Sequence, residues 1–93
     1  MIRIDPRDAV AFNNRGNVRL NKHQYDLAIQ DYNEAIRLDS NSGLYLTNRG
    51  DAFRITGKYA QAIADYRKAL TLRIDGPTKK RIETAFKELG VSG

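Results

Sequence analysis

The side chains whose type and spacing best suit chemistry are three asparagines near the start of the chain. Asn13, Asn17 and Asn21 stand four residues apart, so on a helix they form one row. Each amide can donate and accept a hydrogen bond at once, which suits an extended peptide backbone. Asparagine is a poor helix former, and something has to compensate that cost. Peptide binding is one compensation, and a polar helix face without a ligand is the alternative.

Residues suited to catalysis are sparse. The chain has one histidine, His23, no cysteine and no glycine-rich phosphate loop, which excludes most nucleophilic, metal and nucleotide chemistry. His23 falls in a predicted turn, where a solvated side chain is the simpler interpretation. Asp31 and Asp65 occupy equivalent places, which indicates a structural pairing or a solvated face rather than an acid/base pair. The sequence predicts a protein that is not an enzyme and has no cofactor or metal.

The elements that position these side chains belong to a repeat with a period of 34 residues. The segment from Asn14 to Leu38 returns as the segment from Asn48 to Leu72, with identical residues at ten positions. The pairs are Asn14/Asn48, Arg15/Arg49, Gly16/Gly50, Tyr25/Tyr59, Ala28/Ala62, Ile29/Ile63, Asp31/Asp65, Tyr32/Tyr66, Ala35/Ala69 and Leu38/Leu72. A fixed period of this length is typical of stacked helical repeats.

Apolar periodicity and capping residues predict five helices, over about 9–21, 25–38, 43–55, 59–72 and 78–89. Asp8 and Ser42 are placed to cap the first and third helices, and Gly57 and Gly90 to end the third and fifth. Gly16 is predicted to let two helices approach closely. Small and aromatic side chains at helical spacing predict the core stripe of the second helix, formed by Ala28, Ile29, Tyr32, Ala35 and Ile36.

These residues make the chain resemble the tetratricopeptide (TPR) repeat family, whose unit of 34 residues carries an aromatic, a glycine and an alanine at set positions. The chain departs from the pattern at Arg15, Arg19, Ser40 and their counterparts Arg49, Phe53 and Ile74. The resemblance implies an all-α fold of antiparallel helix hairpins stacked as a short right-handed solenoid. It divides the chain into a remnant of a preceding repeat (1–8), two repeats (9–42 and 43–76) and a capping helix (77–90). The remnant predicts either the C-terminal piece of a longer repeat array or a protein that has lost earlier repeats.

In the TPR family the first helix of each repeat lines a concave groove that holds extended peptides. The resemblance therefore implies a peptide-binding site formed by Asn13, Asn14, Asn17, Asn21, Asn48, Asp51 and Arg54. Asn17 and Asn48 also match the two asparagines of the carboxylate clamp that grips chaperone tails. The cations of that clamp fall at Asn13, Thr78 and Ile82, so binding of chaperone tails is not expected.

Charge and composition indicate which class of partner to expect. The net charge is +5, and from Arg67 onward there are seven basic and three acidic residues. This stretch has a single aromatic, Phe86, and lacks the interleaved aromatics that stack on bases, so nucleic acid is not the expected partner. No apolar run is long enough for a membrane span, and a cytoplasmic location is expected. The expected partner is a protein or peptide held in the groove.

A second hypothesis is self-association. The short segment before Asp8 leaves the first helix with an uncovered side, which predicts a structural or scaffold element that forms a homodimer through this edge. Residues Ile2 and Ile4 are expected to contribute to that interface.

Overall fold

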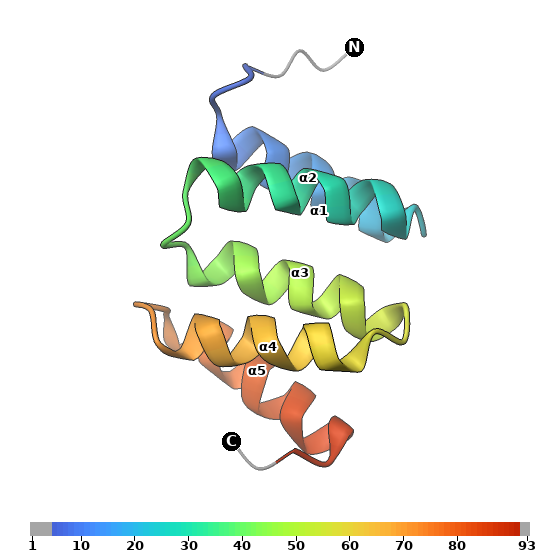
Figure 1. Ribbon diagram of the computed structural model, residues 1–93, viewed down its shortest axis with the longest axis vertical. Coiled ribbons are helices and arrows are strands. Elements are labelled where there is room, and N and C mark those ends of the chain that lie inside the picture. The colour runs from blue at the N-terminus through green and yellow to red at the C-terminus, as the bar shows by residue number, and fades with distance from the viewer. Residues whose placement is uncertain (1–4, 92–93) are drawn as a thin grey trace.

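The computed structural model describes residues 5–91, and every regular element within that range is a helix. The helices are α1 (Ala9–Asn21), α2 (Tyr25–Leu38), α3 (Gly43–Ile55), α4 (Tyr59–Leu70) and α5 (Gly76–Leu89). Consecutive helices run back and forth and stack along the long axis of the molecule (Figure 1). The all-α prediction is confirmed, and the bounds of the first three helices agree with the expected ones. Residues Ile2 and Ile4, which were expected to form part of a dimer interface, lie outside the described residues.

Side chains cap the helices where the sequence indicated. The carboxylate of Asp8 accepts from the backbone amide of Ala11 at 3.1 Å, and the hydroxyl of Ser42 accepts from the amide of Tyr45 at 3.2 Å. Gly90 ends α5 in the left-handed conformation, with φ of 70°. His23 has φ of 62° at the turn after α1, where the second repeat has Gly57. The first turn is therefore the more strained one, as expected.

The connection between α4 and α5 differs from the prediction. Helix α4 ends at Leu70 instead of Leu72, and α5 begins at Gly76, two residues early. Leaving the helix at this point lets Leu72 and Ile74 both pack against the core. Asp75 then caps α5 by accepting from the amide of Thr78 at 2.8 Å.

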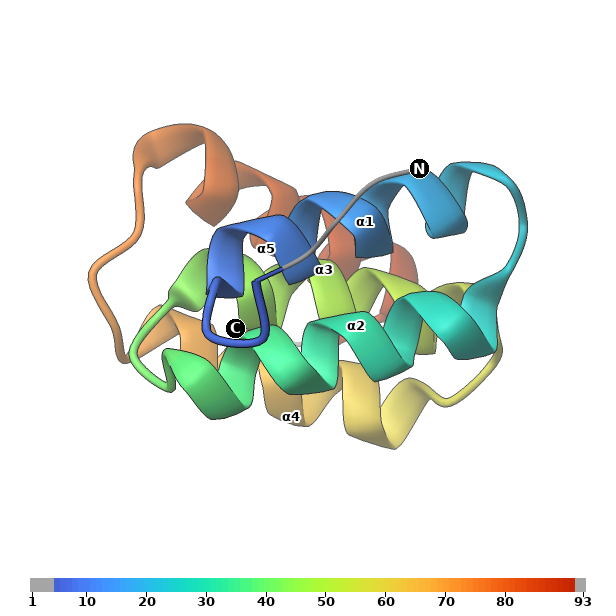
Figure 2. The same ribbon diagram turned by 90° about the horizontal axis from the view of Figure 1, so that it is seen from above.

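The five helices form two layers. Viewed down the stack, α2 and α4 lie on one side and α1 and α5 on the other (Figure 2). Within the pairs, α1 packs on α2 and α3 on α4; between them, α2 contacts α3, and α3 contacts both α1 and α5. Each repeat is thus a helical hairpin, and the first helices of successive hairpins are neighbours.

Close approach inside each hairpin depends on a glycine opposite a tyrosine. A Cβ atom on Gly16 would lie 2.7 Å from Cε1 of Tyr32, and one on Gly50 would lie 2.8 Å from Cε1 of Tyr66. Both tyrosines are fully buried. The prediction that Gly16 is a packing residue is confirmed, and Gly50 plays the same part in the second hairpin.

The buried apolar residues form two clusters. One joins α3, α4 and α5 and includes Leu46, Tyr66, Ile82 and Phe86. The other joins α2 to α3 through Ala28, Tyr32 and Ala52. Residues from neighbouring repeats share each cluster, so the repeats stabilise one another. No helix within residues 5–91 is long and apolar enough to cross a membrane.

Candidate functional site

Two buried carboxylates turn out to be structural. Asp31 accepts from Nε and Nη2 of Arg15 at 2.9 and 2.7 Å and from Nη1 of Arg19 at 3.1 Å. Asp65 accepts from Nε and Nη2 of Arg49 at 2.8 and 2.7 Å. Two-pronged pairs of this kind hold both side chains in one geometry. The aspartates therefore join the two helices of each hairpin, as the structural interpretation of their recurrence predicted.

A line of hydrogen bonds connects the first helices of the two repeats, α1 and α3, with the capping helix α5. Asn48 Nδ2 on α3 donates to Asn13 Oδ1 on α1 at 2.8 Å. Arg81 Nη2 on α5 donates to Asn48 Oδ1 at 3.0 Å and to Asp51 Oδ2 at 2.6 Å. We call these four residues (Asn13, Asn48, Asp51 and Arg81) the polar ladder. Asn13 and Asn48 are only 5% and 6% exposed, whereas Asp51 is half-buried and Arg81 is exposed. The ladder thus runs from the interior to the surface and links α1, α3 and α5.

The two buried tyrosines anchor further polar residues of the same helices. The hydroxyl of Tyr32 donates to Asn17 Oδ1 at 2.6 Å, and the hydroxyl of Tyr66 donates to Asp51 Oδ1. Burial raises the pKa of Tyr32 to about 12, and burial together with the bond to Asp51 raises the pKa of Tyr66. Both phenols therefore stay protonated and keep donating at neutral pH. Asn17 and Asp51 are held at equivalent points of the two repeats.

A cavity of about 420 Å³ lies between α3 and α5. Two helices contribute charged groups to it: Arg54 and Asp51 from α3, and Lys80, Arg81 and Glu88 from α5. Its remaining lining residues are Pro77, Thr84 and Ala85. Arg54 Nη1 donates to Glu88 Oε2 at 3.1 Å, and Glu88 is well exposed, with 59% of its side chain accessible. Three cations and two carboxylates therefore meet in one concave place.

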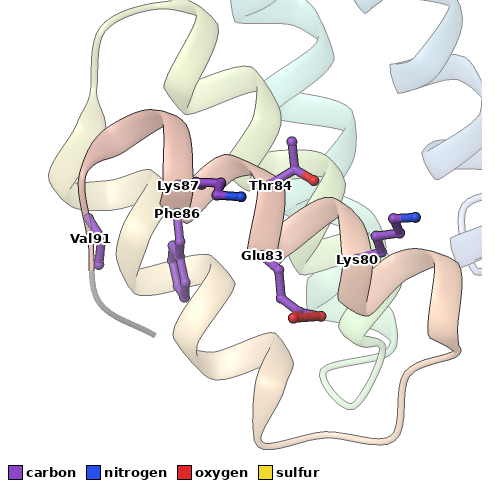
Figure 3. Close-up of a pocket in the computed structure, with 6 residues that line it drawn as sticks. All are labelled: Lys80, Glu83, Thr84, Phe86, Lys87 and Val91. Atoms are coloured by element: carbon purple, nitrogen blue, oxygen red, sulfur yellow. The ribbon is translucent and has the colours of Figure 1, made fainter.

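A second cavity, of about 640 Å³, is lined by five residues of α5 and by Val91, which follows that helix. Figure 3 shows its lining side chains, and they do not converge: Lys80, Thr84 and Lys87 point away from Glu83 and Phe86. Phe86 belongs to the core and is only 4% exposed. This cavity offers a partner no set of polar groups around one point, and the α3–α5 cavity is the better candidate site.

The structure gives different surroundings to the seven residues predicted for the groove. Asp51 and Arg54 line the α3–α5 cavity, and Asn13 and Asn48 are buried in the polar ladder. Asn17 is half-buried beneath the hydroxyl of Tyr32. Asn14 and Asn21 are exposed, and neither has a side-chain hydrogen bond to another residue between 5 and 91. The row Asn13, Asn17, Asn21 therefore runs from an interior end to an exposed end.

Two functional candidates on α5 were missed from the sequence. Arg81 and Glu88 are both solvent-exposed, and each also forms a hydrogen bond with a residue of α3. The clamp positions Thr78 and Ile82 are buried, but the neighbouring Arg81 brings a guanidinium to Asn48. The apolar stripe of α5 could have indicated which residues flank the core. It could not indicate which flank meets α3, because α5 does not repeat an earlier helix.

Comparison with known proteins gives one family. The family model described as tetratricopeptide repeat matches residues 9–42 and 44–73. A search of the curated proteins gave no match.

Proposed function

The chain belongs to the tetratricopeptide repeat family, and on that basis we propose that it is a non-enzymatic interaction module that holds a partner segment along the face formed by α1, α3 and α5. The family consists of non-catalytic repeats that mediate contacts between proteins. The observation that carries the proposal is the α3–α5 cavity, where charged groups from the second repeat and from the capping helix converge beside the polar ladder. The partner is a protein or peptide segment in an extended conformation.

The polar groups of this face suggest how such a segment is held. Asn14 and Asn21 keep free amides on α1 that can pair with a peptide backbone. At the α3–α5 end of this face, the ion pair between Arg54 and Glu88 is exposed. Exposed ion pairs contribute little stability, about 0–1 kcal/mol. A carboxylate on the partner can therefore take the place of Glu88 at small cost. The buried Asn13 and Asn48 and the half-buried Asn17 keep the helices at the spacing that the segment requires.

The test is a peptide-array screen of the full chain followed by affinity measurements on variants. Asn14→Ala combined with Asn21→Ala removes two exposed amides, and Arg54→Ala removes the cation beside Glu88. A matched control combines Asn41→Ala with Gln61→Ala, two exposed amides away from this face. We expect at least tenfold weaker binding for the first set and unchanged binding for the control. Equal binding by all variants would remove the proposal.

Self-association is the second candidate, and one observation favours it. Val18 on α1 is 46% exposed, whereas its counterpart Ala52 on α3 is fully buried. Against it, two such edges facing each other would bring together Arg15 and Arg19 of both copies. Light scattering over a concentration series decides: a mass that grows above 10.5 kDa supports a homodimer, and a constant mass rejects it. A cytoplasmic location is a prediction that cell fractionation tests.

A further inference from the structure

The α3–α5 cavity carries more positive charge than its own carboxylates neutralise. Three cations and two carboxylates line it: Arg54, Lys80, Arg81, Asp51 and Glu88. Both oxygens of Asp51 already accept, one from Arg81 and one from a buried phenol. Glu88 pairs with Arg54. Lys80 forms no ion pair and no hydrogen bond with another residue between 5 and 91, so one cation of the cavity has no counter-ion there.

A hydroxyl group lines the same cavity. Thr84 is exposed on α5 and follows Lys80 by four residues, so the two side chains lie on one face of the helix. Figure 3 shows both on the side of α5 away from Glu83. The hydroxyls of Thr47 and Thr56 donate to backbone carbonyls four residues earlier, at 2.8 and 3.0 Å, but within residues 5–91 the hydroxyl of Thr84 makes no such bond. The cavity therefore presents a hydroxyl donor together with an ammonium group.

Glu88 is the member of this arrangement that a ligand can replace. Its side chain is 59% accessible, whereas that of Asp51 is 19% accessible. Between residues 5 and 91 it forms one hydrogen bond, with Arg54. An exposed ion pair of this kind contributes about 0–1 kcal/mol, so little stability is lost when Glu88 turns into water. Without Glu88 the lining has three positive charges and one negative charge, which is a net charge of +2.

We propose that the α3–α5 cavity binds the phosphate group of a phosphorylated serine or threonine of the partner segment, with Arg54 and Lys80 as its cations and Thr84 as a hydroxyl donor. A phosphate monoester carries a charge of about −1.5 to −2 near neutral pH and three acceptor oxygens. It therefore matches a site of net charge +2 better than a carboxylate does, which has one charge and two oxygens. In the chain without a partner, Glu88 takes the place of the phosphate at Arg54. This inference rests on the proposed function, because the phosphate belongs to the segment held along α1, α3 and α5.

The first measurement isolates the phosphate site. The isotopically labelled full chain is titrated with N-acetyl-O-phosphoserine N-methylamide, and NMR follows the backbone amide and arginine Nε signals. We expect saturable shifts centred on Arg54, Lys80 and Thr84. The unphosphorylated serine compound should cause none, and the corresponding glutamate compound should bind about fivefold more weakly, because it brings one charge instead of nearly two. Absence of shifts up to the solubility limit, or equally tight binding of the glutamate compound, would overturn the proposal.

Two matched pairs of variants make the test specific. Lys80→Gln should weaken binding of the phosphoserine compound about fivefold, whereas Lys79→Gln, an equal change of charge at an exposed residue outside the cavity lining, should leave it unchanged. Glu88→Gln should strengthen binding about threefold, because Arg54 then has no competing carboxylate. Its control is Glu83→Gln, on the opposite side of α5. Equal effects within either pair would show a general attraction by net charge and would overturn the proposal.

A second measurement tests whether the phosphate belongs to the partner segment. Every serine-containing peptide of the array is also printed with phosphoserine, and we expect the full chain to retain the phosphorylated copies more strongly, a gain that Lys80→Gln should abolish. Inorganic phosphate that bound as tightly as the phosphorylated peptides would assign the cavity to a free anion and overturn the proposal. Failure of the groove function alone looks different: unphosphorylated peptides are not retained, while phosphorylated peptides and the phosphoserine compound still bind. Failure of the phosphate site alone leaves the array peptides bound with no gain from phosphorylation.

Discussion

At the scale of single residues, three arginines that depart from the family's pattern pair with the recurring aspartates. Arg15 and Arg49 stand where leucine is usual, and each makes two hydrogen bonds to an aspartate sixteen residues later. Arg49 also reaches Asn33 of the preceding hairpin. At a position where the family usually has an apolar packing residue, this chain therefore has an arginine that forms a bidentate ion pair. The sequence showed that Asp31 and Asp65 recur, but only the hairpin geometry could connect them to these arginines.

The ion pair of the second hairpin gives a stability prediction. Asp65→Asn keeps the shape of the side chain and removes its charge, so we expect a loss of about 2 kcal/mol in the free energy of unfolding, since the hydrogen bonds go to a charged and mostly buried group. Glu34→Gln is the matched control, because Glu34 pairs with the exposed Arg37, and we expect it to lower the free energy of unfolding much less. Urea denaturation measures both. Similar losses in the two variants would show that burial of Asp65 adds nothing.

The buried phenol of Tyr32 predicts how stability depends on alkaline pH. Its pKa is raised from 10.0 to about 12. Below pH 10 the phenol is protonated in both states, and above it the unfolded chain loses the proton first. The stabilisation is therefore complete below pH 10 and is lost as the pH rises toward 12, by roughly 3 kcal/mol at about 1.4 kcal/mol per pKa unit.

Tyr32→Phe is the variant that isolates this effect. It lacks the bond to Asn17 and should be about 1 kcal/mol less stable at pH 7, but its stability should fall less steeply between pH 10 and 12. Urea denaturation at several pH values measures the two slopes. Equal slopes in both proteins would mean that Tyr32 does not take part in the alkaline transition.

At the scale of elements, local signals sufficed where the chain repeats itself. Asp8 and Ser42 begin helices as predicted, and the first three helices have the expected bounds. The prediction failed between α4 and α5, where the side chains of Leu72 and Ile74 pack into the core instead of extending the helix. That choice is made by tertiary packing, which helical periodicity alone does not reveal. The seven residues predicted for the groove lie on α1 and α3, and their burial depends on the neighbouring hairpin, which the sequence pattern does not reveal.

The hairpins themselves depend on the absence of a side chain at two glycines. Gly50→Leu should abolish cooperative unfolding, because even a Cβ would lie 2.8 Å from the ring of Tyr66, whose hydroxyl is bonded to Asp51 and prevents the ring from turning aside. Gly76→Leu is the control, since a Cβ there meets nothing within 4 Å. Thermal melts followed by circular dichroism compare the two. A Gly50→Leu melt within a degree or two of the wild type would show that the close approach is not required.

At the scale of the whole molecule, α5 differs from the other helices because it closes the stack. Its Ile82, Ala85 and Phe86 complete the core over α4, and the ring of Phe86 meets that of Tyr66 edge-on at 5.8 Å. Its Arg81 extends the polar ladder to Asn48 and Asp51. The sequence predicted a capping helix, and the packing of α5 on the core confirms it. Lys79, Arg81 and Lys87 are all exposed, but Arg81 also bonds to α3.

Removal of α5 tests this account of the whole stack. Deleting residues 76–93 should expose Ala62 and Tyr66 on α4 together with Leu46 on α3, so we expect loss of cooperative unfolding, binding of a hydrophobic dye and aggregation.

Substitutions of the charges on α5 separate the cap from the ladder. Lys79→Gln with Lys80→Gln should cost less than about 0.5 kcal/mol, since both side chains are exposed. Arg81→Gln should cost about 1–2 kcal/mol, because it leaves Asp51 and Asn48 without their charged donor. The loss of stability should therefore be largest for the deletion, smaller for Arg81→Gln and smallest for the lysine pair. Urea denaturation of each protein measures it. If the lysine pair destabilised the fold as much as the deletion did, net charge rather than apolar cover would be the stabilising contribution of α5. If Arg81→Gln matched the lysine pair, the ladder would end at Asn48, and α5 would be held to α3 by apolar packing alone.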